Sequence, residues 1–240
     1  MGKNVLIFGA SGDIGSEIAV HLGNLGYSLV LHYHQNRDKI NEIYERLENP
    51  TSILGYFQAD LTKFTEITRC LDEIWYPVDA IIFASGHSYT GIFQEMPVKE
   101  MDNLLSVHVK APWMICKHLL PQMIQRKSGH IIFITSIWGD YGASNEVVYS
   151  SVKGAQSSFV KALAKEVGPS GISVNGISPG FIETKMNKQF TKEERLNIYS
   201  EIPLNRGGFP SEIAFTVQFL LDKRSQYIQG EIIRINGAWI

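Results

Sequence analysis

The fold of this chain is decided near its start by the sequence NVLIFGASGDIG, residues 4–15. An apolar run at 5–8 leads into a turn with glycines at positions 9, 12 and 15, and an amphipathic pattern follows. Gly9 permits a tight turn, while Gly12 and Gly15 let a pyrophosphate and the next helix approach the backbone closely. A glycine turn between a strand and a helix predicts a dinucleotide site at the helix N-terminus.

Short apolar runs of the same kind recur along the whole chain, separated by helical patterns. They are rich in Val, Ile and Phe without polar alternation, as strands of a parallel sheet covered on both faces are. Seven runs are found, at 4–8, 28–33, 52–57, 80–84, 130–135, 173–177 and 231–235. With right-handed crossovers, this pattern predicts an α/β fold in which residues 1–240 form one doubly wound domain, its parallel sheet of about seven strands flanked by helices.

The composition is ordinary for a globular protein and argues against several classes of function. The chain has 240 residues, of which 44% are hydrophobic and 19% charged, and its formal net charge is −2. This charge gives no reason to expect nucleic acid or an anionic membrane as a partner, and no apolar stretch approaches membrane-spanning length. Cys70 and Cys116 lie in apolar helical patterns, which suits a reducing compartment better than a disulfide or zinc site. We expect a cytoplasmic protein without a metal.

A second motif, VYSSVKG at residues 148–154, indicates chemistry. If residues 147–167 are helical, Tyr149 and Lys153 stand at i and i+4 on one face, where the ammonium can act on the phenol. A nearby cation favours the phenolate and should lower the pKa of Tyr149 from about 10 toward the neutral range. A lone Tyr-x-x-x-Lys is usually an ordinary helix face, but here Ser136 stands thirteen residues upstream and can hold a substrate oxygen. Together with the glycine turn, the set predicts a reductase.

The end of the second predicted strand bears on the choice of nicotinamide cofactor. Enzymes that use NAD usually have Asp or Glu there to bind the ribose 2′-hydroxyl. This strand ends near His32, and Asn36 and Arg37 follow, so a 2′-phosphate would meet donors and NADP(H) is favoured over NAD(H). The alternative is that Arg37 is a solvated residue that opens the next helix. Asp60, after the third strand, is placed to hold the adenine, or else serves as a turn or cap residue.

Two further features concern the approach to this site. Asp13 would repel a phosphate if it pointed at one, so we expect it to be the helix N-cap. Residues 183–206 are polar and follow Pro179 and Gly180, just after the carboxyl end of a strand, where sheets of this type bind ligands. They are interpreted as a substrate lid, with a surface excursion of no function as the alternative. The apolar ending at 237–240 fits either a subunit contact or docking on its own domain.

In combination, these motifs resemble the short-chain dehydrogenase/reductases over essentially the full chain, including the segment VNGISPGFIET at 174–184. The resemblance implies a Rossmann fold in which Tyr149 protonates a carbonyl oxygen, Ser136 positions that oxygen, and Lys153 lowers the pKa of Tyr149 while binding the nicotinamide ribose. The predicted cofactor-binding residues are Gly9, Ser11, Gly12, Asp13, Ile14, Gly15, His32, Asn36, Arg37, Asp60, Leu61, Ala84, Ser85, Gly86, Tyr149, Lys153, Pro179, Gly180, Ile182 and Thr184.

Within this family the chain is most similar to the 3-oxoacyl-(acyl-carrier-protein) reductases of fatty acid biosynthesis, through RKSGHII at 126–132, IPL at 202–204 and ING at 235–237. Three departures stand out, of which the first is Asp13 in place of the glycine before Ile14. The family's Asn-Asn-Ala-Gly is FASG at 83–86, and its fourth catalytic residue, an Asn that holds a proton-relaying water, is His108. The imidazole of His108 either relays protons toward the lysine itself or is a helix histidine with a purely structural place.

The expected substrate is a ketone, possibly carried on a protein. Acyl-carrier reductases present arginines to the acidic carrier, whereas Lys127 and Ser170 stand at those places here, so half of the basic patch is missing. The turn, the FASG segment and His108 also resemble reductases of the 5-aminopentanone modification on elongation factor P. The rival of another class is a non-catalytic nucleotide-binding sensor or scaffold. The resemblance further implies a homotetramer formed through the helices that carry the catalytic motifs.

Overall fold

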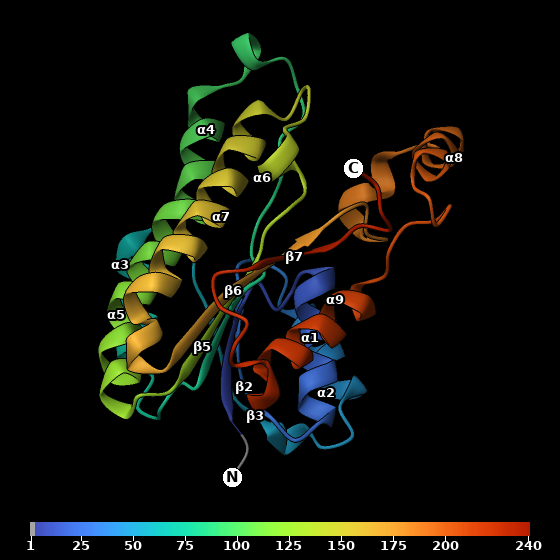
Figure 1. Ribbon diagram of the computed structural model, residues 1–240. Helices are drawn as coiled ribbons and strands as arrows, with labels where there is room; N and C mark the ends of the chain where they lie inside the picture. Colours follow the sequence, from blue (N-terminus) through green and yellow to red (C-terminus); the bar gives the residue numbers. More distant parts are fainter. Residues whose placement is uncertain (1–2) are drawn as a thin grey trace.

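The centre of the structure is a parallel sheet of seven strands in the order β3-β2-β1-β4-β5-β6-β7 (Figure 1). A computed structural model describes residues 3–240, apart from the side chains of residues 188 and 189. The strands are β1 (Asn4–Phe8), β2 (Ser28–Tyr33), β3 (Ile53–Gln58), β4 (Ala80–Phe83), β5 (Gly129–Ile134), β6 (Ile172–Pro179) and β7 (Ile232–Ile235). The strand order reverses at β1, which lies between β2 and β4, so a crevice opens beyond its carboxyl end.

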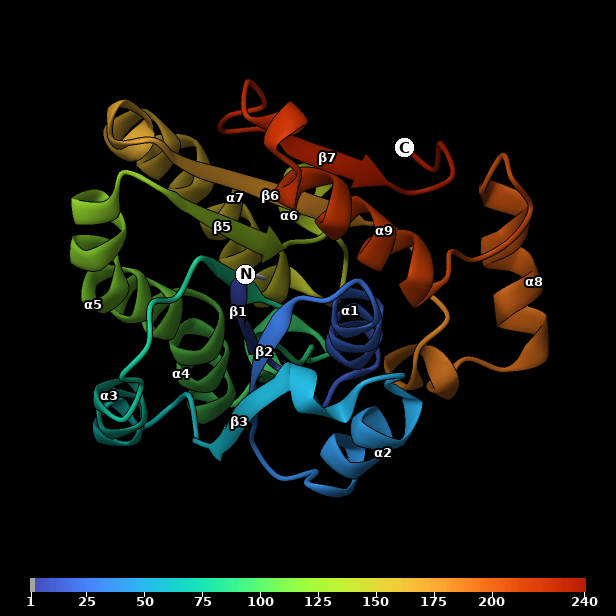
Figure 2. The ribbon, with the colours of Figure 1, turned by 90° about the horizontal axis from the view of Figure 1, so that it is seen from below.

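Helices cover both faces of the sheet, as Figures 1 and 2 show from two directions. One layer consists of α1 (Asp13–Asn24), α2 (Asp38–Arg46) and α9 (Pro210–Leu221), and the other of α3 (Phe64–Asp72), α4 (Val98–Leu105), α5 (Ala111–Arg126) and α7 (Val147–Val167). Val5 and Ile7 of β1 pack in the core on the first side, and Leu6 and Phe8 in the core on the second. Because both faces are buried, this strand is apolar at every one of these positions.

The predicted fold class is confirmed. β1, β2 and the helix at 147–167 begin and end at the predicted residues, and the other five strands differ from the prediction by one or two residues at an end. The predicted lid contains the 3₁₀ turn Lys185–Gln189 and the helix α8 (Lys192–Glu201), which stands apart from the sheet in Figure 1. Among residues 3–240, no helix is both long enough and apolar enough to cross a membrane.

Besides the backbone pairing of β7 with β6, the buried side chain of Asn175 on β6 holds the turn that leads into this edge strand. Its amide nitrogen donates to the carbonyl of Ile228 at 2.8 Å and to the hydroxyl of Ser173 at 3.1 Å, and its carbonyl oxygen accepts the N–H of Glu231 at 2.9 Å. The side chain therefore supplies partners for backbone groups on both sides of the turn that leads into β7.

We expect Asn175→Leu to lower the free energy of unfolding by about 2–4 kcal/mol, because it leaves the part-buried Ile228 carbonyl and Glu231 N–H without their partners. Urea denaturation followed by circular dichroism measures this change. Ser173→Ala is the control, since it removes one acceptor of the same amide and should cost less than about 1.5 kcal/mol. If the unfolding free energy of Asn175→Leu equals that of the parent, the hydrogen bonds of Asn175 with Ile228 and Glu231 do not stabilise the fold.

Candidate active site

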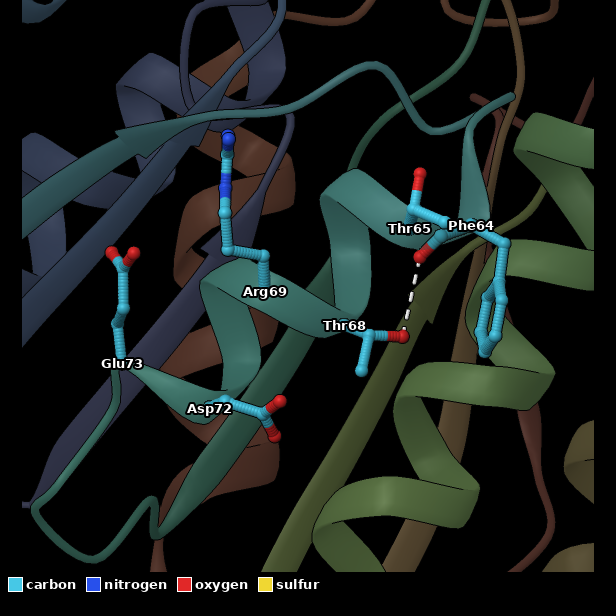
Figure 3. A pocket seen from close by; sticks show the side chains of 6 residues that line it. All are labelled: Phe64, Thr65, Thr68, Arg69, Asp72 and Glu73. Carbon is cyan, nitrogen blue, oxygen red and sulfur yellow. Dashed lines mark hydrogen bonds between the residues drawn. The ribbon is translucent and has the colours of Figure 1, made fainter.

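Two cavities lie at the carboxyl ends of the strands, and most of the predicted site residues line them. The first, of 690 Å³, is lined by Gly9, Ser11, Gly12, His32, His34, Gln35, Asp60, Leu61, Thr62, Ala84, Ser85, Gly86, His87, Lys99, Asn103 and Val107. The second, of 550 Å³, contains Ser136, Tyr149 and Gly180. A further hollow, along the surface of α3, contains no predicted site residue (Figure 3).

The glycine turn leaves no room for side chains at its two tightest points. Gly9 has a φ of +79°, and a Cβ there would lie 2.5 Å from the Cα of Ser85. A Cβ at Gly15 would lie 2.1 Å from the carbonyl oxygen of Gly9. Gly12 is the N-cap of α1 without a side-chain hydrogen bond, so the first N–H groups of this helix face the turn unbonded by a cap. Such an end is an anion site by geometry and by dipole.

The prediction that Asp13 is the N-cap of α1 is wrong. Gly12 is the N-cap, because it has the extended backbone of the residue that directly precedes a helix. Asp13 is then the first residue with helical backbone. The Asp13 carboxylate instead accepts the backbone N–H of Lys185 at 2.5 Å. The acid therefore ties the glycine turn to the start of the predicted lid, 172 residues further along the chain.

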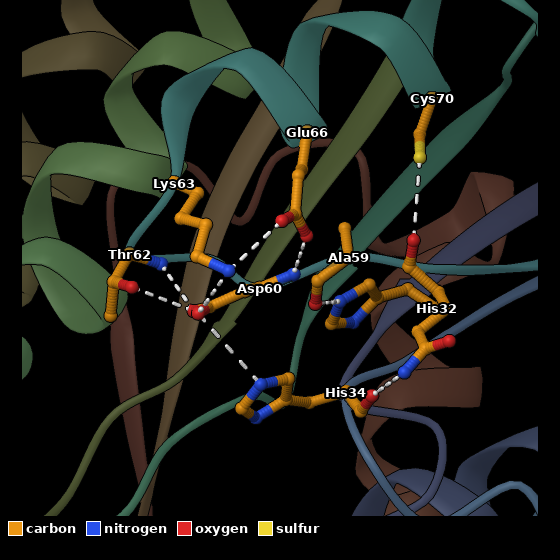
Figure 4. Close-up of polar contacts among 9 residues, drawn as sticks. His32, His34, Ala59, Asp60, Thr62, Lys63, Glu66 and Cys70 are labelled. Carbon is orange, nitrogen blue, oxygen red and sulfur yellow. Dashed lines mark hydrogen bonds and ion pairs between the residues drawn. The ribbon is translucent and has the colours of Figure 1, made fainter.

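His32 braces three strand ends with its two ring nitrogens, and Figure 4 shows the contact with Ala59. Its Nδ1 accepts the N–H of Gly9 at 3.1 Å, so Nε2 carries the proton and donates to the carbonyl of Ala59 at 3.0 Å. Burial lowers the pKa of His32 to about 4, which keeps the ring neutral and this arrangement intact at pH 7. His32 lines the first cavity as predicted, but as a wall whose polar atoms are already bonded.

Asp60 is both a turn residue and part of the cavity wall. Its Oδ1 accepts the N–H of Thr62 at 2.9 Å and the Thr62 hydroxyl at 2.7 Å, and its carboxylate lies 3.6 Å from the Lys63 ammonium and 4.0 Å from His34 (Figure 4). Burial raises the pKa of Asp60, but the hydrogen bonds from Thr62 outweigh it, and the pKa ends below its ordinary value. The carboxylate is thus held ionised at the cavity.

Asn36 and Arg37 were predicted to meet the cofactor, and the structure places both outside the cavity wall. The Asn36 side chain accepts the N–H of Lys39 at the start of α2. Arg37 donates to the hydroxyl of Tyr56 at 3.0 Å, and its guanidinium lies 5.6 Å from the centre of that ring. Both are engaged because α2 begins directly after them; His34 and Gln35 line the cavity instead.

The second cavity owes its shape to a close contact between α7 and the short helix α6 (Trp138–Tyr141), which follows β5. A Cβ at Gly139 would lie 2.7 Å from the carbonyl carbon of Lys153, and a Cβ at Gly154 would lie 3.0 Å from the carbonyl oxygen of Gly139. Two glycines therefore let the loop that carries Ser136 reach the face of α7 that carries Tyr149 and Lys153.

Ser136, Tyr149 and Lys153 come together as the sequence predicts. The buried Ser136 hydroxyl accepts the N–H of Trp138 at 3.2 Å and lines the same cavity as Tyr149. The Lys153 ammonium lies 5.6 Å from the centre of the Tyr149 ring and donates to the carbonyl of Ile134 at 2.9 Å. Burial lowers the pKa of Lys153 to about 7.

The expected lowering of the Tyr149 pKa is not found. The pKa of Tyr149 is raised to about 12, chiefly by burial; the Ser136 hydroxyl lowers it in part, and the negative charge of Glu146 raises it. Lys153 does not bring it down, since burial disfavours the charge of the lysine itself. The phenol is accordingly protonated at neutral pH.

His108 lies behind this group, in a π-helical turn (Ser106–Lys110) between α4 and α5. Pro112 has no N–H for the carbonyl of His108, and that carbonyl accepts the side chain of Gln156 at 2.7 Å instead. The ring stands edge-on to Tyr149 with 5.7 Å between centroids. Its Nε2 lies 2.9 Å from the carbonyl oxygen of His87, closer than the 3.3 Å to the backbone nitrogen of the same residue. Its buried Nδ1 has no hydrogen-bond partner among residues 3–240. Burial, and next the Lys153 charge, place the pKa of His108 well below its usual value.

Several predicted residues, Ile14, Pro179, Ile182 and Thr184, line neither of the two cavities. Pro179 ends β6, and a Cβ at Gly180 would lie 2.9 Å from the Cα of Asn236. Ile182 is buried, and Thr184 precedes the 3₁₀ turn of the lid. Ile14 is partly buried against the core below the glycine turn.

The predicted lid does line the second cavity, through Met186, Asn187, Phe190 and Ile198. Its polar side chains are tied together by hydrogen bonds of Glu183 with Arg195 and Tyr199. The sequence analysis missed the remaining wall, which consists of Trp138, Glu146, Phe181 and Trp239 among others. Trp239 packs edge to face on Trp138, with 5.2 Å between centroids, so the apolar ending docks on its own domain. The aromatic side chain in that ending was the available signal.

The first cavity fits a nicotinamide dinucleotide by its chemistry. The glycine turn is a cradle that a Cβ would fill, and the hydroxyl of Ser85 is buried without a partner among the described residues. Lys153 has three donors, and a single acceptor, the Ile134 carbonyl, is bonded to them in the structure. Among residues 3–240, no three side chains are grouped as metal ligands.

The fold and the site define a short-chain dehydrogenase/reductase, and comparison with known proteins shows that the chain belongs to this family of oxidoreductases. The family model for short chain dehydrogenases matches residues 3–195. The chain is 43% identical to the "uncharacterized oxidoreductase YmfI" of Bacillus subtilis, over 100% of this chain and 99% of that one. It is 30% identical to the 3-oxoacyl-[acyl-carrier-protein] reductase FabG of Staphylococcus epidermidis, over 99% of each. The crystal structure of YwfH, an NADPH dependent reductase involved in bacilysin biosynthesis, has the same fold, with a TM-score of 0.93, 24% identity, and coverage of 100% and 99%.

The buried lysine should make stability depend on pH. Because the folded-state pKa of Lys153 is about 7 and its ordinary value is 10.5, the unfolded chain binds more protons than the folded one between these limits, and stability rises with pH. From pH 7 to pH 9 we expect the unfolding free energy of the parent to rise by roughly 1–2 kcal/mol relative to Lys153→Met. Urea titrations of both proteins at the two pH values measure it, and parallel pH dependences would contradict the assigned shift.

Proposed function

We propose that this protein is an NADPH-dependent carbonyl reductase that acts on a ketone, with Tyr149 as the general acid. The observation that carries the proposal is that Ser136 and Tyr149 line one cavity, with the Lys153 ammonium 5.6 Å from the centre of the Tyr149 ring. A nucleotide-binding sensor without turnover has no need of this arrangement.

The chain's own groups suit the reduction of a carbonyl. NADPH, when bound, supplies the hydride. Tyr149 is protonated at neutral pH, as a general acid must be before it gives its proton to the developing alkoxide. Ser136, whose oxygen accepts the Trp138 N–H, has a hydroxyl proton with which to orient the carbonyl oxygen. Lys153 would hold the nicotinamide ribose with the donors that Ile134 does not use, and would favour the phenolate left after proton transfer.

Preference for NADPH over NADH is part of the proposal. Its support is the end of β2, where the residues that line the cavity are His32, His34 and Gln35 and no carboxylate is present to bind a ribose 2′-hydroxyl. Asp60, an acid in the wall of the same cavity, is bonded to Thr62 and lies 4.0 Å from His34. Donors from His34 and Gln35 take the place that the sequence analysis gave to Asn36 and Arg37.

The substrate is proposed to be a ketone borne on a larger carrier. One candidate is a 3-oxoacyl group on acyl-carrier protein, supported by the similarity to FabG over the whole chain. The other is the 5-aminopentanone group on elongation factor P, supported by the departures at 83–86 and at His108.

We also propose a cytoplasmic homotetramer. Leu105 and Trp113, about half exposed on α4 and α5, are suited to burial between subunits.

We further propose that His108 supports proton return to Lys153. Its Nε2 donates to the His87 carbonyl, which leaves the lone pair of Nδ1 as a buried acceptor next to Lys153 and Tyr149. Gly86 is required for this placement, because a Cβ there would lie 2.4 Å from the His108 ring. A water between Nδ1 and the ammonium would satisfy both groups.

Tyr149→Phe should reduce kcat for ketone reduction by about 10²–10⁴, because it removes the acid and leaves the cavity shape nearly unchanged. NADPH oxidation, followed by absorbance with a panel of β-ketoesters and 3-oxoacyl thioesters, measures this, and fluorescence titration checks that NADPH still binds. Tyr227→Phe, at a fully exposed tyrosine, is the control and should match the parent. If no ketone is reduced by the parent, or Tyr149→Phe retains full activity, the reductase proposal fails.

His108→Leu should lower kcat by about tenfold or more and alter its dependence on pH, because the Nδ1 acceptor is lost. His108→Asn restores a polar side chain and should recover much of the rate. Steady-state kinetics between pH 6 and pH 9 measure both variants, with NADPH affinity as the check on folding. A pH profile and rate of His108→Leu and His108→Asn that both equal those of the parent would exclude the relay.

A further inference from the structure

The second cavity has a single charged side chain among the described residues that line it. Glu146 precedes α7 as its N-cap residue, and Tyr149 follows three positions later, so the two side chains lie on adjacent positions of the same helical turn. No lysine, arginine or histidine that the structure describes lines this cavity. Among the described side chains that line this cavity, the charge next to the reacting oxygen is therefore a negative one.

Aromatic rings make up much of the remaining wall. Trp138, Phe181, Phe190 and Trp239 line the cavity together with Tyr149. The faces of such rings carry negative potential and attract cations, most strongly in the case of tryptophan. A carboxylate and a group of aromatic rings around one cavity are the features with which proteins bind ammonium groups. An anionic substrate would meet repulsion from both.

The carboxylate of Glu146 is not used by the protein itself. Burial is the single cause that shifts its pKa, upward, so no hydrogen bond or charge of the described residues compensates its partial removal from water. α7 begins without a side-chain cap bond, so Glu146 does not act as a hydrogen-bonding cap either. Its charge does reach the reaction centre, where it raises the pKa of Tyr149. A cation bound between them would relieve both effects.

We propose that Glu146, with the aromatic wall around it, selects ketones that carry an ammonium group a few bonds from the carbonyl carbon. The inference rests on the proposed carbonyl reductase function and names its substrate class. Of the two carrier-borne candidates, the amino ketone has this cation and the 3-oxoacyl thioester does not. Binding of the ammonium would also remove the repulsion between the Glu146 charge and the phenolate that Tyr149 becomes.

Three ketones with one skeleton, CH₃COCH₂CH₂CH₂–X, test the proposal: 5-(dimethylamino)pentan-2-one, which is protonated at pH 7; its neutral isostere 6-methylheptan-2-one; and the anion 5-oxohexanoate. The tertiary amine prevents cyclisation to an imine. We expect kcat/KM of the parent enzyme with NADPH to be about tenfold higher for the ammonium ketone than for the neutral isostere, and lowest for the anion.

Glu146→Gln should reduce the ratio of the two kcat/KM values to about one, mainly through KM of the ammonium ketone, and Glu146→Lys should favour 5-oxohexanoate instead. Glu166→Gln removes the same charge from the exposed far end of α7 and should keep the parent ratio. NADPH affinity and the melting temperature establish that each variant is folded.

A parent ratio near one, or a ratio that survives Glu146→Gln, would overturn the selectivity even if all three ketones are reduced. A fall in melting temperature without a change in the ratio would show that Glu146 serves the helix alone, and would equally overturn it. Reduction of the neutral ketone keeps the reductase function in either case, whereas no turnover with any of the three, nor with the β-ketoester panel, would overturn both.

Discussion

The whole site depends on how closely β1 and β4 approach each other where they end. The carbonyl of Phe8 accepts the N–H of Ala84 at 2.9 Å, and directly beyond this bond Gly9 passes the backbone of Ser85 so closely that no side chain fits. This contact turns the chain away into α1 and leaves the helix N–H groups facing the crevice. His32 holds the same turn from the other side, through the N–H of Gly9. The close backbone contact between Gly9 and Ser85 thus determines where the nucleotide cavity lies.

Burial governs the electrostatics of the catalytic group. Lys153 and Tyr149 both have pKa values displaced toward the neutral form, to about 7 and about 12. A lysine close to half protonated at neutral pH can gain or lose a proton at little cost, while the phenol next to it starts out protonated. The nearby His108 is held neutral by the same burial. In the proposed mechanism, the proton donor, the reservoir and the acceptor would therefore all depend on one property of the environment, the removal of water.

The sequence predicted those parts that depend on local pattern. The apolar strands, the glycine turn and the helix of Tyr149 and Lys153 follow from periodicity and spacing, and the family resemblance implied the meeting of these residues with Ser136. What it did not predict depends on distant partners. Asp13 bonds to Lys185, and Trp239 packs on Trp138, across separations that no local motif encodes. The direction of the Tyr149 pKa shift was wrong because burial, which only the folded chain defines, outweighs the charge that spacing alone suggested.

In the π-helical turn at Ser106–Lys110, a change of one side chain and a change in the number of residues have different structural consequences. One extra residue in a helical turn rotates all that follows by about 100° about the helix axis. The rotation sets which side of α5 meets the sheet, where Ile115, Leu119 and Met123 belong to the core. Position 108 can differ between relatives at the cost of a single side chain. Loss of one residue from the turn would instead turn the whole of α5, so the number of residues in this segment is under stricter constraint than their kind.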